Sequence, residues 1–273
     1  MQRLLSSALR LLLYTNIWVA LCMAVLMMGF VHAHHLAYPW HYGLFAFTAT
    51  FATYNFHRLV RLQKLHDTAA DSPRTRWLNN HRLLLLLSAI LAAVIASVTL
   101  LFLQHDQLTF IVTGAMGLVI AGYVFGTRFR PLREWAGMKN IWISCVWSGV
   151  LLLPLLPYPE KILPAEFLAI ALLVYVAIIP FDIRDLPYDP EHMRTIPQLF
   201  GKRGAQILGT LLVIPALLSL SSVYDLQTSM LLPVVSQIGA LMLVETNTSH
   251  SYLPEFIWES PLLFTGICYF TLG

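Results

Sequence analysis

Three aspartates lie close together past the middle of the chain, at Asp182, Asp185 and Asp189. Spacings of three and seven residues place carboxylates on one face of a helix, but a proline two residues after Asp185 is expected to end or bend that helix. Asp189 would then come from the following loop. Adjacent carboxylates repel one another and need a positive charge, which Mg²⁺ shared with a ligand's phosphates would supply. The alternative is a solvated loop whose acids pair with Arg184 and Arg194.

The composition indicates which elements must carry these aspartates. Hydrophobic residues make up 58% of the 273 residues and charged residues only 11%, whereas a soluble domain carries about 25% charged residues. This excludes an ordinary soluble enzyme, and the content of 15 Phe, 11 Tyr and 7 Trp excludes a disordered chain. Apolar stretches of membrane-crossing length occur at 9–31, 38–57, 83–103, 108–126, 138–157, 162–181, 205–223, 227–244 and 254–272. We therefore predict an all-α polytopic membrane protein with nine transmembrane helices, in which residues 1–273 form one domain.

The basic residues indicate how these helices are oriented. Lys and Arg concentrate on the cytoplasmic side of membrane proteins. With the N-terminus in the cytoplasm, all of the 17 Lys and Arg residues except Lys161 lie on that side. We expect a cytoplasmic N-terminus and an outer C-terminus, in the inner membrane of a bacterium. The expected partners are membrane lipids and not nucleic acid, because topology already explains the basic loops.

The aspartate cluster and the residues around it resemble the motifs of one known family. The pattern D-x-x-D-x-x-x-D is followed by Arg194-Thr195-Ile196-Pro197-Gln198-Leu199-Phe200-Gly201, and the stretch before the fifth apolar segment holds Tyr123, Arg128, Arg130, Pro131, Lys139 and Asn140. In these features the chain is similar to the UbiA superfamily of intramembrane prenyltransferases. The second aspartate-rich motif of that family is intact here, and nine spans with two large cytoplasmic loops are also its arrangement.

The resemblance implies a fold, a reaction and a set of site residues. The fold would be a UbiA-like helical bundle with a cavity open to the cytoplasmic side. The reaction would be the Mg²⁺-assisted transfer of an isoprenyl group from an isoprenyl diphosphate to an aromatic or other lipophilic acceptor. Asp182, Asp185 and Asp189 would be catalytic and would ligate the metal. The residues assigned to the substrate would include Tyr123, Arg128, Arg130, Lys139, Tyr188 and Arg194.

The first aspartate-rich motif of the family, N-D-x-x-D-x-x-x-D, is degenerate in this chain. The corresponding stretch is Asn55-Phe56-His57-Arg58-Leu59-Val60-Arg61-Leu62-Gln63, which keeps the asparagine, expected to be catalytic, and replaces every aspartate. In one interpretation His57, Arg58 and Arg61 bind the phosphate directly, and the second motif alone holds Mg²⁺. In another, the ionisation chemistry is lost, and the protein binds a lipid phosphate or isoprenoid without turnover. In a third, these basic residues only mark the cytoplasmic end of the helix.

Overall fold

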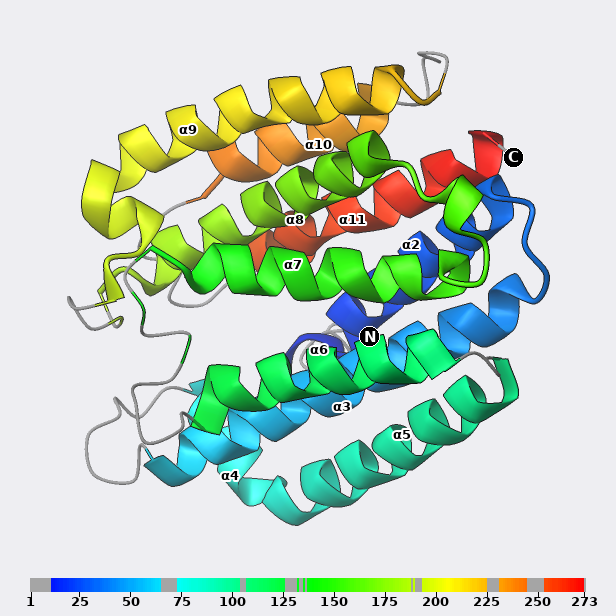
Figure 1. The fold of residues 1–273 in the computed structure, drawn as a ribbon. Coiled ribbons are helices and arrows are strands. Elements are labelled where there is room, and N and C mark those ends of the chain that lie inside the picture. Colours follow the sequence, from blue (N-terminus) through cyan, green and yellow to red (C-terminus); the bar gives the residue numbers. More distant parts are fainter. Residues whose placement is uncertain are drawn as a thin grey trace, which may run out of the picture.

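A computed structural model of the chain describes residues 11–64, 73–103, 107–125, 132, 135, 137–187, 189, 193–224, 231–244 and 253–272. Every regular element within these ranges is a helix (Figure 1). The α-helices are α2 (Ile17–Ala33), α3 (Pro39–Lys64), α4 (Pro73–Asn80), α5 (Arg82–Leu103), α6 (Gln107–Phe125), α7 (Lys139–Leu152), α8 (Pro164–Asp185), α9 (Ile196–Ser221), α10 (Leu231–Met242) and α11 (Leu253–Leu272). Two short 3₁₀ helices, η2 (Leu153–Leu155) and η3 (Pro159–Lys161), connect α7 to α8.

Each of the nine predicted apolar segments overlaps one of these helices, which confirms the all-α prediction for the described residues. Three helices, α5, α8 and α9, are long and apolar enough to cross a membrane. Five further helical stretches are apolar but shorter, so the prediction of nine complete spans stays a prediction. Long apolar helices of this kind are typical of an integral membrane protein.

Two of the helix boundaries that differ from the sequence prediction lie close to the predicted site residues. The helix α3 continues to Lys64, whereas the apolar segment was expected to end at residue 57, because the helix carries on through polar residues beyond the apolar stretch. The helix α9 begins at Ile196, nine residues before the predicted apolar segment. Its first turn is separated from the rest by a kink at Gly201, whose φ of 70° favours glycine. Both extensions lie beside the aspartate cluster or the degenerate motif.

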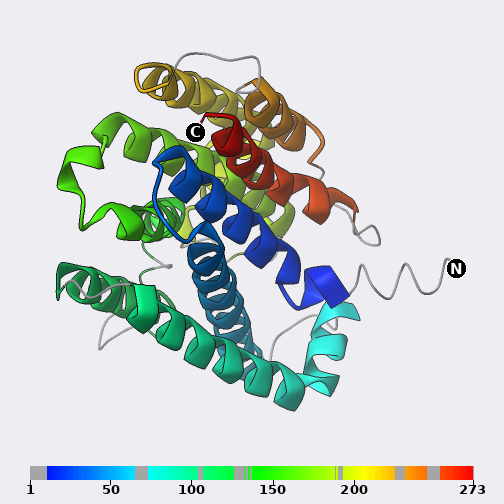
Figure 2. The same cartoon turned by 90° about the vertical axis from the view of Figure 1, so that its right-hand side faces the viewer.

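The helices pack into a closed ring (Figures 1 and 2). The helix α2 packs against α3, and α3 packs against both α5 and α6; α6 packs against α7, α7 against α8, and α8 against α9. The helices α9, α10 and α11 follow in turn, and α11 returns to pack along α2. The first and last of the labelled helices therefore close the ring.

The contact between α2 and α11 depends on two glycines. A methyl group added to Gly266 would lie 2.6 Å from the backbone nitrogen and Cα of Leu26, and one added to Gly29 would overlap the carbonyl oxygen of Gly266. Close by, Trp18 stacks on Phe256 with 3.8 Å between ring centroids. Small residues allow two helix backbones to approach closely, as in many membrane proteins.

A buried polar cluster joins several helices at the end of the bundle where α2 ends and α8 begins. The Glu166 carboxylate lies 2.9 Å from His34 Nε2 and accepts a hydrogen bond of 2.6 Å from the Tyr224 hydroxyl. Glu166 is almost fully buried. The Lys161 ammonium donates to the backbone carbonyl of His34. These contacts link α2, η3, α8 and the segment after α9, and they satisfy a carboxylate that would otherwise be costly to bury.

The outer face of α5 is apolar. Leu83, Leu84, Leu87 and Leu91 are each more than half exposed. Apolar side chains scattered singly on a surface are ordinary, but a continuous apolar helix face requires an apolar environment. Lipid chains would provide that environment, which agrees with the hydropathy of this helix.

Candidate functional site

The centre of the site is a lysine placed between two aspartates. The Lys139 ammonium lies 2.6 Å from Asp182 Oδ1 and 3.4 Å from Asp189 Oδ2. The Asp182 side chain is fully buried and that of Lys139 is 16% exposed. Lys139 is the first residue of α7, and Asp182 lies in the last turn of α8, so the packing of these two helices brings the charges together.

The third aspartate has a different partner. Arg184 donates two hydrogen bonds to the Asp185 carboxylate, from Nε at 2.7 Å and from a terminal nitrogen at 3.0 Å. The same guanidinium lies over the rings of Phe181 and Trp258. The predicted alternative in which an acid pairs with Arg184 is therefore confirmed for Asp185. Asp182 and Asp189 pair with Lys139, which that alternative did not name.

The start of α9 holds the segment that carries Asp189. The helix α8 ends at Asp185, and so Asp189 comes from the loop beyond it, as the proline at position 187 predicted. Gln198 accepts a hydrogen bond from the Thr195 backbone N–H and donates one of 3.1 Å to the Asp189 carbonyl. The Thr-Ile-Pro-Gln stretch thus begins a helix and also anchors the Asp189 backbone.

Two of the predicted substrate-binding residues connect α3 to α6. The His57 ring stacks on the Tyr123 ring with 5.9 Å between centroids. Tyr123 therefore lies beside the degenerate first motif.

The other residues of the first motif support the turn before α2. The Asn55 amide nitrogen donates to the backbone carbonyls of Thr15 and Phe51, and its oxygen accepts a hydrogen bond from Asn16. Arg58 donates to the Tyr14 carbonyl at 3.0 Å. The Asn55 amide therefore uses its hydrogen-bonding groups to hold α3 against the turn that precedes α2. Its predicted catalytic role stays a prediction, and the structure adds a structural role beside it.

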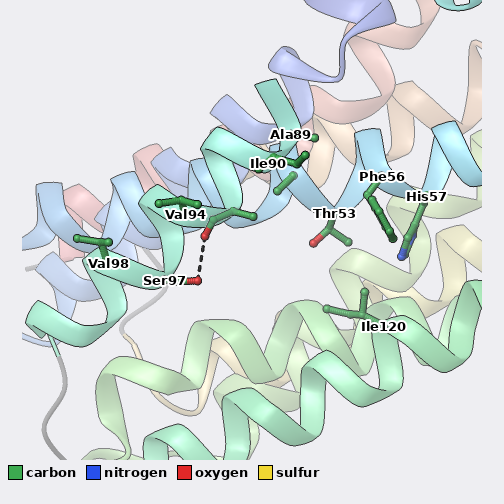
Figure 3. A pocket seen from close by; sticks show the side chains of 11 residues that line it. Thr53, Phe56, His57, Ala89, Ile90, Val94, Ser97, Val98 and Ile120 are labelled. Carbon is green, nitrogen blue, oxygen red and sulfur yellow. Dashed lines mark hydrogen bonds between the residues drawn. The ribbon is translucent and has the colours of Figure 1, made fainter. Parts of the chain in front are cut away.

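An apolar groove of about 520 Å³ runs between α3, α5 and α6 (Figure 3). Most of its wall is provided by alanine, valine and isoleucine side chains, with Thr53, His57 and Ser97 as polar members. His57 and Val98 lie at opposite ends of the groove, and Ile120 faces it from α6. The residues that line it are Ala52, Thr53, Phe56, His57, Ala89, Ile90, Ala93, Val94, Ser97, Val98 and Ile120. His57 therefore belongs both to the groove and to the ring contact with Tyr123.

The remaining predicted site residues lie elsewhere or outside the described residues. Arg194 is exposed and lies two residues before the first residue of α9. Arg128, Arg130 and Tyr188 fall outside the described residues, as does the side chain of Arg61. Their predicted roles in substrate binding stay predictions.

The donor groups fit a divalent cation in one particular way. The carboxylates of Asp182 and Asp189 face a single position, now filled by the Lys139 ammonium, and Asp182 Oδ2 is buried without a hydrogen bond from any described residue. Carboxylate oxygens are the ligands that Mg²⁺ prefers, so these two side chains suit a cation that replaces the ammonium. No group of three or more His, Cys, Asp or Glu side chains suited to a metal exists among the described residues. Arg184 holds Asp185 in the structure, and the predicted role of Asp185 as a third metal ligand stays a prediction.

Two residues of the site, Asn140 and Gln198, stand in the quoted motifs but were not predicted as site residues. Asn140 follows Lys139, and its side chain is buried beside Asp182. Gln198 holds the Asp189 backbone. The four-residue pattern from Thr195 to Gln198 is a helix-start signal that would have found Gln198. No local pattern would have shown that Asn140 is next to Asp182.

The fold and the site define a helical, membrane-type bundle with a charged centre, and solved structures of the same shape exist. A UbiA homolog from Archaeoglobus fulgidus bound to DMAPP and Mg²⁺ is similar with a TM-score of 0.58 and 12% identity, over 95% of this chain and 99% of that chain. Digeranylgeranylglyceryl phosphate synthase is similar with a TM-score of 0.55 and 14% identity, over the same shares. No family model and no curated protein sequence matches the chain. The chain therefore has a UbiA-like fold.

Proposed function

We propose that the protein binds an isoprenyl diphosphate at the Lys139 cluster and transfers its isoprenyl group to a lipophilic acceptor within the membrane. The observation that carries the proposal is the Lys139 ammonium between the buried Asp182 and Asp189 carboxylates, with one Asp182 oxygen left unbonded by the described residues. Unsatisfied buried polar atoms of this kind are rare in structural ion pairs and common where a ligand binds. The UbiA-like fold supports the choice of ligand.

The charged residues of this chain would bind and orient the diphosphate. Lys139, with its flexible stem, would contact the phosphate oxygens, while His57 and Arg58 would approach from α3. Bound Mg²⁺, held by Asp182 and Asp189, would neutralise the leaving group. The bond between the allylic carbon and the diphosphate oxygen breaks with both electrons leaving on pyrophosphate. The acceptor then forms a bond to the carbon and loses a proton.

The groove between α3, α5 and α6 would hold the hydrocarbon chain. Its volume lies within the range of small-molecule sites, about 300–1,000 Å³. The phosphate end would lie near His57, a polar residue at one end of the groove that stacks on Tyr123. Apolar walls with one polar end suit an amphiphile whose head group binds at the charged cluster.

A second candidate function is the binding of a lipid phosphate without turnover. The observation that favours it is the loss of all three aspartates from the first motif, together with the structural contacts of Asn55 and Arg58. With one carboxylate pair instead of two motifs, charge developing on the leaving group would be less well stabilised. The fold and the groove would serve this function equally well.

The deciding experiment measures pyrophosphate release by the purified protein in lipid nanodiscs, supplied with isoprenyl diphosphates of increasing length and a membrane lipid extract. Prenyl transfer predicts sustained release that Asp182→Asn abolishes, while Glu160→Gln, a change in the η3 connection, leaves it intact. Binding of the diphosphate without release would support the second candidate. Neither binding nor release would refute both.

We also propose that the protein is in the inner membrane of a bacterium, with a cytoplasmic N-terminus and an outer C-terminus. The distribution of Lys and Arg along the sequence supports this orientation. A cysteine-accessibility assay at engineered sites in the 182–204 region and near Lys161 would test it. The proposal requires that a membrane-impermeant reagent labels only the second site in intact cells.

A further inference from the structure

The position between Asp182 and Asp189 already holds a cation that belongs to the chain. Lys139 Nζ contacts both carboxylates, at 2.6 Å and 3.4 Å, and all three side chains are mostly withdrawn from water. Interactions between charges are much stronger in such surroundings than in water. Any cation that binds this carboxylate pair must therefore compete with the Lys139 ammonium.

The charges indicate when a metal ion could displace the Lys139 ammonium and when it could not. Two carboxylates and one ammonium carry one net negative charge, and the addition of a divalent cation would make the group positive while pressing two cations together. A diphosphate supplies several negative charges and oxygens that accept hydrogen bonds from an ammonium. With a diphosphate present, Lys139 has an alternative partner, and the carboxylates become available to the metal.

Asn140 also borders this position. Its side chain is buried beside the Asp182 carboxylate. An amide is neutral, so it does not offset the charge of the carboxylates, and the Lys139 ammonium carries the positive charge that a metal ion would have to displace.

On the basis of the proposed function, we propose that Lys139 is a built-in competitor of the metal, so that a divalent cation and a diphosphate bind this site together and the metal alone does not. Lys139 thereby acts as a positioning residue that couples the two ligands. Coupling of two ligands through one group is reciprocal, so the metal raises the affinity for diphosphate by the same factor as the diphosphate raises that for the metal.

The test measures Mn²⁺ retained by the purified protein in nanodiscs, by electron paramagnetic resonance, with Mn²⁺ alone and with inorganic pyrophosphate. The wild-type protein is expected to bind Mn²⁺ at least about tenfold more tightly with pyrophosphate than without it. Lys139→Met is expected to bind Mn²⁺ alone about as tightly as the wild type binds it with pyrophosphate. Lys161→Met removes a lysine at the other end of the bundle and is expected to behave as the wild type.

A second readout covers the case in which Lys139→Met folds poorly. Removal of the ammonium leaves two buried carboxylates without their cation, which is strongly destabilising. Mn²⁺ alone should restore the thermal stability of this variant, and should not change that of the wild type or of Lys139→Met combined with Asp182→Asn. The inference is overturned if the wild type binds Mn²⁺ alone as tightly as Lys139→Met does, or if Mn²⁺ does not restore that variant. These results are independent of turnover, which tests the proposed function separately.

Discussion

The glycine contact between α2 and α11 predicts opposite effects for the same substitution at two places in the fold. In Gly266→Ala the new methyl group would lie 2.6 Å from backbone atoms of Leu26. Backbone atoms cannot rotate away, so the two helices must separate. In Gly114→Ala, on α6, the methyl group would meet no atom within 4 Å. The first change is therefore expected to destabilise the protein and the second to be neutral or favourable.

The sizes of the two effects follow from the kind of contact. Overpacking of a well-packed interior costs about 1–3 kcal/mol, and a clash with backbone belongs at the upper end of that range. Replacement of a helical glycine by alanine returns about 0.5–1 kcal/mol. Gly266→Ala should therefore lower the free energy of unfolding by about 2 kcal/mol, whereas Gly114→Ala should raise it by up to about 1 kcal/mol.

The assay is unfolding in mixed micelles by increasing SDS, followed by tryptophan fluorescence. Trp18 is a suitable reporter because it stacks on Phe256 in the same helix contact. Gly29→Ala meets the same obstruction from the other side, so the double variant should cost less than the sum of the two single variants. An unfolding free energy for Gly266→Ala within about 0.5 kcal/mol of wild type would refute the argument. A loss in Gly114→Ala equal to that in Gly266→Ala would also refute it.

Three further predictions concern other parts of the fold. Glu166→Gln should lower the unfolding free energy by about 2 kcal/mol, because hydrogen bonds to a charged group contribute about 1.5–3 kcal/mol. In the same unfolding assay, the control Glu160→Gln should have little effect because Glu160 is exposed. Ala93→Phe should fill the groove and weaken the binding of long-chain isoprenyl diphosphates at least about tenfold, measured by calorimetry, without weakening the binding of pyrophosphate. Equal weakening of both ligands would contradict the proposal that the groove holds the hydrocarbon chain. Gly201→Ala should lower the melting temperature, because alanine is strained at a φ of 70°, and an unchanged melting temperature would contradict a strained kink.

The secondary structure was largely accessible from the sequence, since apolar stretches and proline positions act locally. The stretch from Pro164 to Asp185 predicted a helix that ends before Asp189, and the structure confirms it. The start of α9 was missed, because Gly201, Lys202, Arg203 and Gly204 separate its first turn from the apolar stretch, with a kink at Gly201. Apolar periodicity does not report on such a turn, whereas the Thr195 to Gln198 pattern does.

The contacts between residues of the site that lie far apart in the chain could not be predicted from the sequence. Lys139 and Asp182 are 43 residues apart and meet only because α7 packs against α8. The sequence placed Lys139 on a diphosphate through the family resemblance, and the structure adds its contact with two aspartates. The pairing of Asp185 with its neighbour Arg184 is local, and for that reason the solvated-loop alternative could name it.

The closure of the ring by α2 and α11 has a consequence for the synthesis of the protein. A ribosome releases α2 well before α11, so the glycine face of α2 has no native partner while the helices between them enter the membrane. Until α11 arrives, that face must be covered by lipid or by the insertion machinery. Chains that stop before α11 would therefore leave the bundle open along α2.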